Sequence, residues 1–463
     1  MRRYNAYNPS PVIWNTEFPA GWKFIRGKNL YKKENRPTRN FDKVVTCFRD
    51  GQVTLRENRR TTGFTESIKE IGYQGIRKGD LVIHVMDAFA GAIGVSDSDG
   101  KGSPIYSVCT AKRDVNNYYY AYLLREVARN GYIKSLYRGI RERSSDFRFE
   151  VFANEFYPVP PRAEQDQIVR FLDWKVSEIN KLIGIRQKEI QELEELKDNI
   201  IFQATTSGLN KNVPMKRTGN RWLGTIPEQW DVVQVRRAYS VILGKMLSLK
   251  PLDFTYTYEN YVCAKDVHFD GVNLSNLKKM WFSTAEKKQY KIKTGDLLVV
   301  EGGAGAGNAA LVDEPLEHEV FVQNSIHIIR PKNNLTTNKF LAYWIKSLVR
   351  RDYMKFVCNV ATIPHYTKDK VMSTVMPLPP LKEQQEIVRY LADESLKIEN
   401  LINKKHSQIT VLQELKGSLI SDVVTGKIDV RNIPVPAYEH VDDLTADDGE
   451  GNDEETGIPG EED

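Results

Sequence analysis

The chain has 463 residues, of which 41% are hydrophobic, 27% charged and 10% aromatic. This length predicts two to four domains, and this composition excludes collagen-like, mucin-like and wholly disordered proteins. With 66 Lys and Arg against 61 Asp and Glu, the formal net charge of +5 is too small by itself to indicate a nucleic-acid partner.

The charge is distributed unevenly along the chain. Residues 1–157 carry 27 basic and 17 acidic side chains, and residues 211–376 carry 24 and 15. The last 25 residues, 439–463, hold 12 acidic side chains and no Lys or Arg. Two basic blocks separated by near-neutral segments indicate a polyanion that is contacted at two places. The acidic, glycine-rich end is predicted to be disordered.

The four cysteines and the N-terminal residues indicate in which cellular compartment the protein is found. Cys47, Cys109, Cys263 and Cys358 lie far apart, without a CxxC pair, which predicts reduced core thiols and no metal site. The first residues are basic and polar, unlike a signal peptide, and no segment approaches the roughly 18 apolar residues of a membrane span. We therefore expect a soluble, cytoplasmic protein that makes no membrane contact.

The first basic block, residues 1–157, has the pattern of a mixed α/β domain. The apolar run at residues 80–85 (DLVIHV) follows a glycine and predicts a strand, and residues 118–129 predict a helix. A proline pair at 160–161 then precedes a long helix that we expect to end near Gly208.

The second basic block, residues 211–376, has the same order of elements. Strands are predicted at residues 296–300 (DLLVV) and 320–329, and a helix at 338–351. A second proline pair, at 379–380, precedes another long helix that is expected to end at Gly426.

The two halves are copies of one plan. Residues 158–206 and 377–425 align without a gap at an offset of 219, and 19 of the 49 positions are identical. Upstream, WNTEFPAGW from Trp14 matches WLGTIPEQW from Trp222, and IRKGDLVI from Ile76 matches IKTGDLLV from Ile292. The chain therefore divides into a domain at 1–157, a helix at 158–210, a domain at 211–376, a helix with a C-terminal segment at 377–438, and the acidic tail at 439–463.

Apolar residues recur at steps of three and four along both long helices. A single helix cannot bury such a stripe alone, and two helices of the same register predict an antiparallel coiled-coil pair, although each could instead pack on its own domain. About 44 residues would span about 66 Å, which suits a spacer. The candidate residues for the spacer and for the docking of other subunits are Ile179, Ile183, Ile190, Leu193, Ile398, Ile402, Ile409 and Leu412.

The sequence lacks the common motifs of catalytic and cofactor-binding sites. The segment VMDAFAGAIGV from Val85 imitates a glycine-rich S-adenosylmethionine turn, but the matching segment, VEGGAGAGNAAL from Val300, lacks the Asp and Phe. We therefore expect these glycines to serve turns or close backbone approach. The sequence contains no GxxxxGK[ST], HExxH or GxSxG, so we expect no catalytic residue and no metal or cofactor bound by this chain.

Both domains interleave basic, aromatic and amide side chains in segments with loop character. Arg and Lys suit phosphates and guanine, and Asn and Gln suit adenine, so this mixture is typical of proteins that read DNA grooves. The candidate DNA contacts are Arg36, Arg39, Arg59, Arg60, Arg141 and Arg143 in the first domain, and Lys245, Lys265, His268, Lys278, Lys279, Thr362, His365 and Tyr366 in the second.

The repeated helix segments resemble the specificity subunit of type I restriction-modification systems. The resemblance is carried by LPPLKEQQEIV and its first copy PVPPRAEQDQIVRFL, by LQELKGSLISDVVTGKIDV, and by the paired WNTEFPAGW and WLGTIPEQW, and it leaves only the acidic tail uncovered. The first copy departs from the pattern at Arg162 and Ala163 and in ATTSGLN, which makes the first docking surface less regular.

The resemblance implies a fold and a set of partners. The expected fold is mixed α/β, with two target recognition domains linked by two long antiparallel coiled-coil helices in a pseudo-twofold repeat. The expected function is to read a bipartite, asymmetric target in double-stranded DNA. Two methyltransferase subunits would dock along the helices, restriction subunits would join through them, and S-adenosylmethionine, ATP and Mg would be bound by those partners.

Two other functions stay open on the sequence alone. One is a self-sufficient S-adenosylmethionine-dependent DNA methyltransferase built on residues 87–94. The other is a coiled-coil adaptor with no DNA role.

Overall fold

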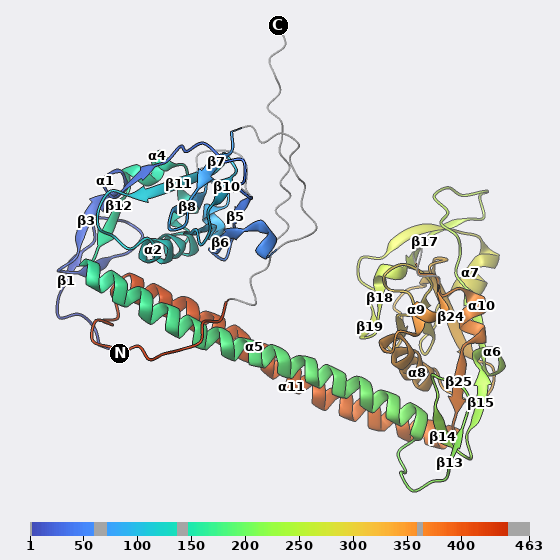
Figure 1. Ribbon diagram of the computed structural model, residues 1–463. Helices are drawn as coiled ribbons and strands as arrows, with labels where there is room; N and C mark the ends of the chain where they lie inside the picture. Colours follow the sequence, from blue (N-terminus) through green and yellow to red (C-terminus); the bar gives the residue numbers. More distant parts are fainter. Residues whose placement is uncertain (1, 60–71, 137–146, 359–363, 443–463) are drawn as a thin grey trace. The chain divides into compact units, whose positions relative to one another are not determined.

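The computed structural model describes residues 2–59, 72–136, 147–358 and 364–442. The chain forms two compact units: Met1–Gln187 with His406–Asp463 is unit 1, and Lys188–Lys405 is unit 2. Two long helices, α5 (Arg162–Ser207) and α11 (Leu381–Val424), each contribute to both units. The division therefore runs across these helices, and each unit consists of a lobe with one stretch of each helix (Figure 1).

The lobe of unit 1 is a mixed α/β structure around a four-stranded antiparallel sheet with the order β4-β11-β8-β9. Helix α2, predicted from the sequence, covers this sheet (Figure 1). The strands are β1 (Tyr7–Pro9), β2 (Glu17–Pro19), β3 (Lys23–Arg26), β4 (Tyr31–Lys33), β5 (Val45–Cys47), β6 (Val53–Leu55), β7 (Gln74–Ile76), β8 (Leu81–His84), β9 (Ile93–Val95), β10 (Gly100–Gly102), β11 (Tyr106–Ala111) and β12 (Phe156–Val159). The helices are α1 (Gly27–Leu30), α2 (Asn117–Arg129), α3 (Tyr132–Ser135) and α4 (Phe149–Asn154).

The lobe of unit 2 repeats this plan. Its four-stranded antiparallel sheet has the order β16-β24-β21-β22, and helix α8 packs on it. A further three-stranded sheet has the order β20-β17-β23. The strands are β13 (Met215–Arg217), β14 (Thr225–Pro227), β15 (Asp231–Gln234), β16 (Tyr239–Leu243), β17 (Thr257–Val262), β18 (Val267–His268), β19 (Gly271–Val272), β20 (Lys278–Phe282), β21 (Leu297–Val300), β22 (Ala309–Leu311), β23 (Phe321–Val322), β24 (Ile326–Pro331) and β25 (Val375–Leu378). The helices are α6 (Val235–Ala238), α7 (Thr284–Tyr290), α8 (Asn338–Arg350), α9 (Tyr353–Val357) and α10 (Lys368–Ser373).

The central strand of each lobe is buried on both faces. In β21, Leu297 and Val299 belong to the core beneath α8, whereas Leu298 and Val300 belong to a second core on the other face of the sheet. Strand β8 divides its residues between two cores in the same way. Because successive side chains of a strand point to opposite faces, a sheet covered on both sides needs an unbroken apolar run. This requirement explains the apolar runs LVI at residues 81–83 of β8 and LLVV at residues 297–300 of β21.

One predicted strand is wrong in its extent. The run at residues 320–329 is not a single strand, because a turn separates β23 from β24. In this turn the backbone N–H of Ile326 donates to the carbonyl of Gln323, at 2.9 Å. The Ser325 hydroxyl also donates to the Gln323 side chain, at 2.8 Å. Strand β23 pairs with β17, and β24 pairs with β16 and β21.

In each unit, α5 and α11 lie side by side and run antiparallel (Figure 1). In unit 1, Lys416 donates to the Asn180 side chain at 3.2 Å, and the end of α11 shares a core with residues 168–172 of α5. In unit 2, Lys405 pairs with Glu189 at 2.9 Å and Lys197 with Glu399 at 2.7 Å. None of the described helices is long and apolar enough to cross a lipid bilayer.

A tryptophan–glutamate hydrogen bond joins the lobe to the helix pair in both units. The indole N–H of Trp22 donates to Glu164 at 2.9 Å, and that of Trp230 donates to Glu383 at the same distance. The glycine that ends the opposing helix contacts the same indole: a Cβ on Gly208 would lie 3.1 Å from Trp230. A Cβ on Gly426 would lie 2.9 Å from Trp22, and both glycines have the left-handed backbone predicted for a helix end.

The C-terminal segment begins as an ordered extension of unit 1. The side chain of Gln167 donates to the carbonyls of Val430 and Ile433, and that of Asn180 donates to the carbonyl of Val441. The prediction of disorder from residue 439 is therefore wrong for residues 439–442, because Asn180 and Ser177 of α5 bind the main chain of Val441. Residues 443–463 lie outside the described part of the chain.

We predict that Glu383→Ala destabilises unit 2. Trp230 is fully buried, so the substitution leaves its indole N–H without an acceptor in the core. Such a loss costs about 1 to 3 kcal/mol. Urea unfolding followed by circular dichroism measures the change, with hydrogen exchange locating it in unit 2. Glu386→Ala, at an exposed site on the same helix, is the matched control and should be near neutral.

Candidate nucleic-acid interface

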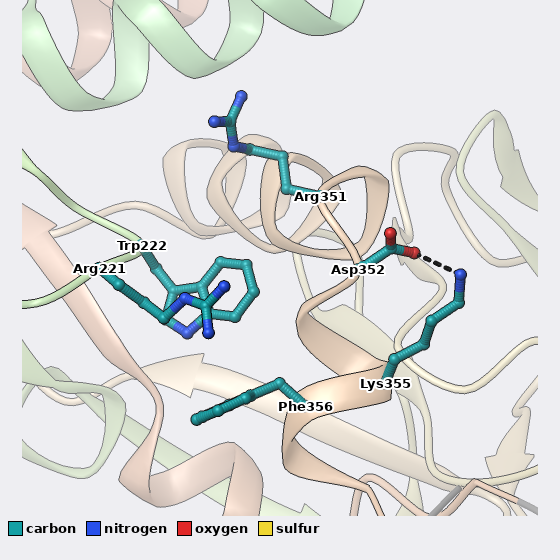
Figure 2. A pocket seen from close by; sticks show the side chains of 6 residues that line it. All are labelled: Arg221, Trp222, Arg351, Asp352, Lys355 and Phe356. Carbon is teal, nitrogen blue, oxygen red and sulfur yellow. Dashed lines mark ion pairs between the residues drawn. The ribbon is translucent and has the colours of Figure 1, made fainter.

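Unit 2 has an open, basic hollow beside the β13–β14 hairpin. Its volume is about 600 Å³, and Figure 2 shows the side chains that line it. The Arg221 guanidinium lies over the rings of Trp222 and Phe356, at 4.9 and 5.3 Å. Asp352 pairs with Lys355 at 2.8 Å. The lining residues are Arg221, Trp222, Arg351, Asp352, Lys355 and Phe356.

This hollow was not predicted from the sequence. Arginine over aromatic rings with further cations nearby suits a flat or anionic group. The only sequence signal was the pair Arg221-Trp222, which lies in the repeated tryptophan segment. In the matching segment of unit 1, Ile13 precedes Trp14, so the arginine belongs to unit 2 alone.

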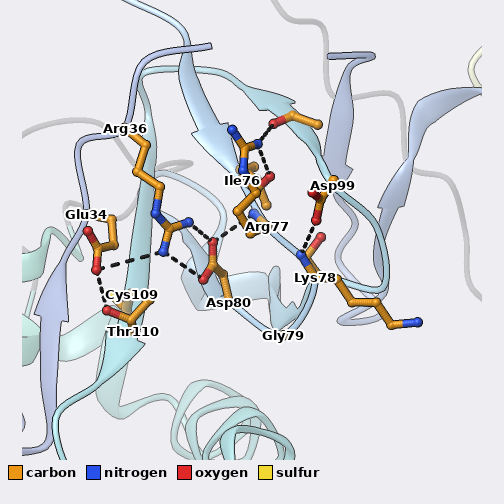
Figure 3. A network of polar contacts seen from close by, with 12 residues as sticks. Glu34, Arg36, Ile76, Arg77, Lys78, Gly79, Asp80, Asp99, Cys109 and Thr110 are labelled. Carbon is orange, nitrogen blue, oxygen red and sulfur yellow. Dashed lines mark hydrogen bonds and ion pairs between the residues drawn. The ribbon is translucent and has the colours of Figure 1, made fainter. Parts of the chain in front are cut away.

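The glycine–aspartate turns that precede β8 and β21 hold ion pairs. Asp80 accepts from the backbone N–H of Arg77 at 2.8 Å and pairs with Arg36 at 2.5 Å (Figure 3). In unit 2, Asp296 accepts from the Lys293 N–H at 2.8 Å and pairs with Arg330 at 2.6 Å. The candidate Arg36 therefore closes a turn, and its guanidinium is mostly occupied there.

Two other arginines of unit 1 have acidic partners. Arg39 is exposed, lies over Phe41 and contacts Asp99 at 3.3 Å. Arg59 lies over the Phe48 ring, 4.2 Å from its centroid, and pairs with Asp50 at 2.6 Å. Arg39 is therefore better placed to reach a phosphate. The predicted contacts Arg60, Arg141 and Arg143 lie outside the described residues.

Unit 2 brings several of its predicted residues to the surface. Lys278 and Lys279 are exposed at the start of β20. Lys265 is exposed next to Asp266, and the ring of His268 bonds the carbonyl of Lys265 at 2.9 Å. These four side chains offer positive charge or hydrogen-bond donors to solvent.

Two predicted contacts in unit 2 are wrong. Lys245 is 8% exposed, and its ammonium is held by Glu286 at 2.5 Å, so it anchors a loop instead of facing solvent. Tyr366 is fully buried, with its hydroxyl against Thr374 at 2.5 Å. The sequence motif NVATIPHY could not distinguish the exposed His365 from its buried neighbour. Thr362 of the same motif lies outside the described residues.

Several helix residues predicted for docking are also wrong in that role. Five of them are buried inside the units and so do not face another subunit: Ile179, Ile183, Ile190, Ile398 and Ile409. Leu193, Ile402 and Leu412 are half-buried. Other apolar residues of the two helices are exposed: Leu182, Ile185, Leu196, Leu396, Leu401, Val411 and Leu415.

The glycine-rich turns serve the backbone, as expected. Gly91 has a φ of +97°, and a Cβ on Gly94 would lie 1.9 Å from the carbonyl oxygen of Gly51. In that turn Asp87, the methyltransferase-like acid, pairs with Arg49 at 3.0 Å. Among the described residues, no cluster of three His, Cys, Asp or Glu side chains could hold a metal ion. Burial raises the pKa of the Cys47 and Cys109 thiols, which suits core cysteines.

Comparison with known proteins shows which family the chain is similar to. Residues 227–411 match the family described as type I restriction modification DNA specificity domain. The chain is 23% identical over 437 residues to the putative type I restriction enzyme MjaX specificity subunit of Methanocaldococcus jannaschii, covering 90% of this chain and 95% of that one. It is also 25% identical over 300 residues to the MjaVIII specificity subunit of the same organism. The chain is therefore similar to type I restriction enzyme specificity subunits over 90% of its length.

The matches differ in how much of each relative they cover. The alignment with the MjaVIII specificity subunit spans 61% of this chain and 64% of that subunit. One chain of a solved type I restriction-modification assembly superposes with a TM-score of 0.66 at 17% identity, covering 89% of this chain and 99% of that one. This superposition shows that the two chains share a fold. Specificity subunits are the non-catalytic component of type I restriction systems, which fits the missing catalytic motifs.

A buried histidine gives a test of the core around Tyr366. His327 lies in β24 and donates from Nε2 to the Tyr366 carbonyl at 3.0 Å, and its Nδ1 has no hydrogen-bond partner among the described residues. Burial lowers the pKa of His327 to about 4. The folded protein therefore keeps this ring neutral in a pH range where the unfolded chain protonates it.

We predict that the protein loses stability as the pH falls from about 6.5 to about 4, because only the unfolded state then takes up the proton. The shift corresponds to about 3 kcal/mol. Urea unfolding of the wild type and of His327→Gln at pH 7.5 and pH 4.5 measures this dependence. The wild type should lose more stability than the variant over this interval, and equal losses would contradict a neutral buried ring.

Proposed function

We propose that this chain is the DNA-reading subunit of a type I restriction-modification complex, with one half of a bipartite, asymmetric target read by each lobe. The observation that carries the proposal is that the two lobes share a sheet order and differ in their exposed loops. The connection after β4 holds Arg36, Arg39 and Phe41, whereas the connection after β16 is mostly apolar. A shared scaffold with different loops supports two different half-sites.

We propose that the helix pair is the spacer between the half-sites. The 46 residues of α5 span about 69 Å, the length of about 20 base pairs of B-form DNA. The antiparallel contacts in both units, and the repeated Trp–Glu bonds, support an antiparallel coiled coil with pseudo-twofold symmetry. The target sequences would then be separated by a gap that the helix length sets.

The partners follow from the same arrangement. Two methyltransferase subunits would dock on the exposed apolar side chains of α5 and α11, such as Leu182 and Leu401, and restriction subunits would join through them. S-adenosylmethionine, ATP and Mg would be bound by those partners and not by this chain. The cytoplasm, where the DNA is, would be the site of action.

Two alternatives are distinguished by simple binding measurements. A self-sufficient methyltransferase would bind S-adenosylmethionine in equilibrium dialysis of the isolated chain. The pairing of Asp87 with Arg49 and the structural use of Gly91 and Gly94 speak against it. A coiled-coil adaptor would show no salt-sensitive DNA binding, even when its partners are present.

We predict that Lys278→Gln with Lys279→Gln weakens DNA binding about equally on all sequences. Both ammonium groups are exposed and suit phosphates, so removing each one should reduce the salt dependence, the slope of log K against log salt, by about 1. Fluorescence anisotropy at several salt concentrations measures this slope. Lys339→Gln, an exposed lysine on α8, is the control, and an equal effect there would contradict a local interaction with phosphate.

We predict that seven residues added to α5 after Gln187, with seven added to α11 after Lys405, widen the gap in the target. Both helices lengthen by about 10 Å while the apolar register is kept, which corresponds to about three base pairs. Sequencing of methylated sites in cells that carry the variant reads the gap directly. An unchanged gap would show that the helices do not set the spacing.

A further inference from the structure

The connection between β16 and β17 in unit 2 presents an unusual row of apolar side chains to solvent. Phe254 is 99% exposed and Leu252 is 83% exposed. Met246, Leu247 and Leu249 in the same connection are also exposed, as is Tyr258 at the start of β17. Exposed apolar residues this close together indicate a binding surface. We call residues 246–254 the apolar loop.

The apolar loop is anchored at its start and at Ser248. Lys245, immediately before it, is buried and paired with Glu286 at 2.5 Å, and its backbone N–H donates to the Val322 carbonyl at 3.0 Å. The N–H of Trp281 in β20 donates to the Ser248 carbonyl at 3.1 Å. The first part of the loop is therefore held in place by the lobe, which lowers the ordering cost of binding there.

The surroundings of the apolar loop favour DNA as its partner. Lys250 within the loop is exposed, and β20, to which the loop is bonded, begins with the exposed Lys278 and Lys279. Asp253 is the single acid of residues 246–254. Apolar side chains framed by lysines match a groove whose walls are phosphates and whose floor carries apolar groups.

The corresponding connection of unit 1 has a different chemistry. Residues 34–44, after β4, read ENRPTRNFDKV and hold three basic side chains and one exposed aromatic residue, Phe41. The same place in the repeated fold is therefore polar and basic in unit 1 and apolar in unit 2. Such a difference is expected where two copies of one fold read different base edges.

We propose that the apolar loop reads thymine methyl groups in the major groove of the half-site bound by unit 2. The thymine C5-methyl is the apolar group that the major groove offers, and leucine and methionine side chains contact it without hydrogen bonds. The half-site read by unit 2 is therefore expected to contain A·T pairs at the positions that the loop reaches. This inference rests on the proposed function and specifies how one lobe distinguishes its bases.

The test compares thymine with uracil, which lacks only the C5-methyl group. The full chain, purified in its native complex, first selects its target from randomised duplexes. Thymines in each half-site are then replaced by uracil. Affinity should fall about fourfold for each methyl group that the loop no longer contacts, in one half-site only. Unchanged affinity, or a unit 2 half-site without A·T pairs, would overturn the proposal.

Loop variants assign the effect to its residues. Leu249→Ser with Leu252→Ser should bind the thymine and uracil duplexes equally, while the other half-site stays unchanged. Leu335→Ser, an apolar side chain 59% exposed in the same lobe, should keep the wild-type preference for thymine. If the loop variant still preferred thymine, the loop would not read bases. The same conclusion would follow if the wild type showed no preference for thymine and the variant lost a partner subunit. Absence of any salt-dependent DNA binding would instead refute the proposed function.

Discussion

The buried hydrogen bond between a tryptophan of each lobe and a glutamate at the start of each long helix is the contact on which the architecture depends. Trp22 with Glu164 and Trp230 with Glu383 are equivalent bonds of equal length. A carboxylate near a helix N-terminus is stabilised by the helix dipole, and an indole N–H gives it a donor that water would otherwise supply. Each lobe is thereby fixed to the helix start, and Gly208 or Gly426 lets the opposing helix end against the same ring.

This contact explains why the first unit needs both ends of the chain. In unit 2 the chain runs without interruption from the end of α5 to Trp230. In unit 1 the end of α11 contacts a tryptophan that lies near the N-terminus instead. The Tyr7 hydroxyl donates to the Gly426 carbonyl, and the Asp429 N–H donates to the Arg2 carbonyl. In unit 1 the N-terminal segment and the end of α11 together form the contact that one continuous segment forms in unit 2.

The two lobes differ in their connecting loops, although their four-stranded sheets have the same strand order. The four-stranded sheets have the same order, and their central strands are buried on both faces, so their sequences are restricted to apolar runs. The connections after β4 and β16 have no such restriction. One holds Arg39 and Phe41, and the other exposes Leu252 and Phe254. Different binding surfaces can therefore be presented by one repeated fold.

Local sequence patterns were sufficient to predict the two long helices and the repeated plan of the lobes. The proline pairs, the closing glycines and the three- and four-residue periodicity predicted both long helices, and the repeat predicted two similar lobes. These signals act through the backbone and through one face of a helix, so neighbouring residues suffice to express them. The periodicity was less informative about burial, because Leu182 and Leu401 of the same stripe are exposed.

Tertiary packing determines which polar and aromatic residues face solvent. Lys245 and Tyr366 have the residue types of DNA contacts, yet Glu286 and Thr374, distant or unremarkable in the sequence, hold them in the core. Arg36 closes a turn through Asp80, which lies 44 positions away. The exposure of Leu252 and Phe254 was not predicted, because an apolar residue in a sequence is expected inside. Exposure depends on what the rest of the chain covers, and no local pattern contains that information.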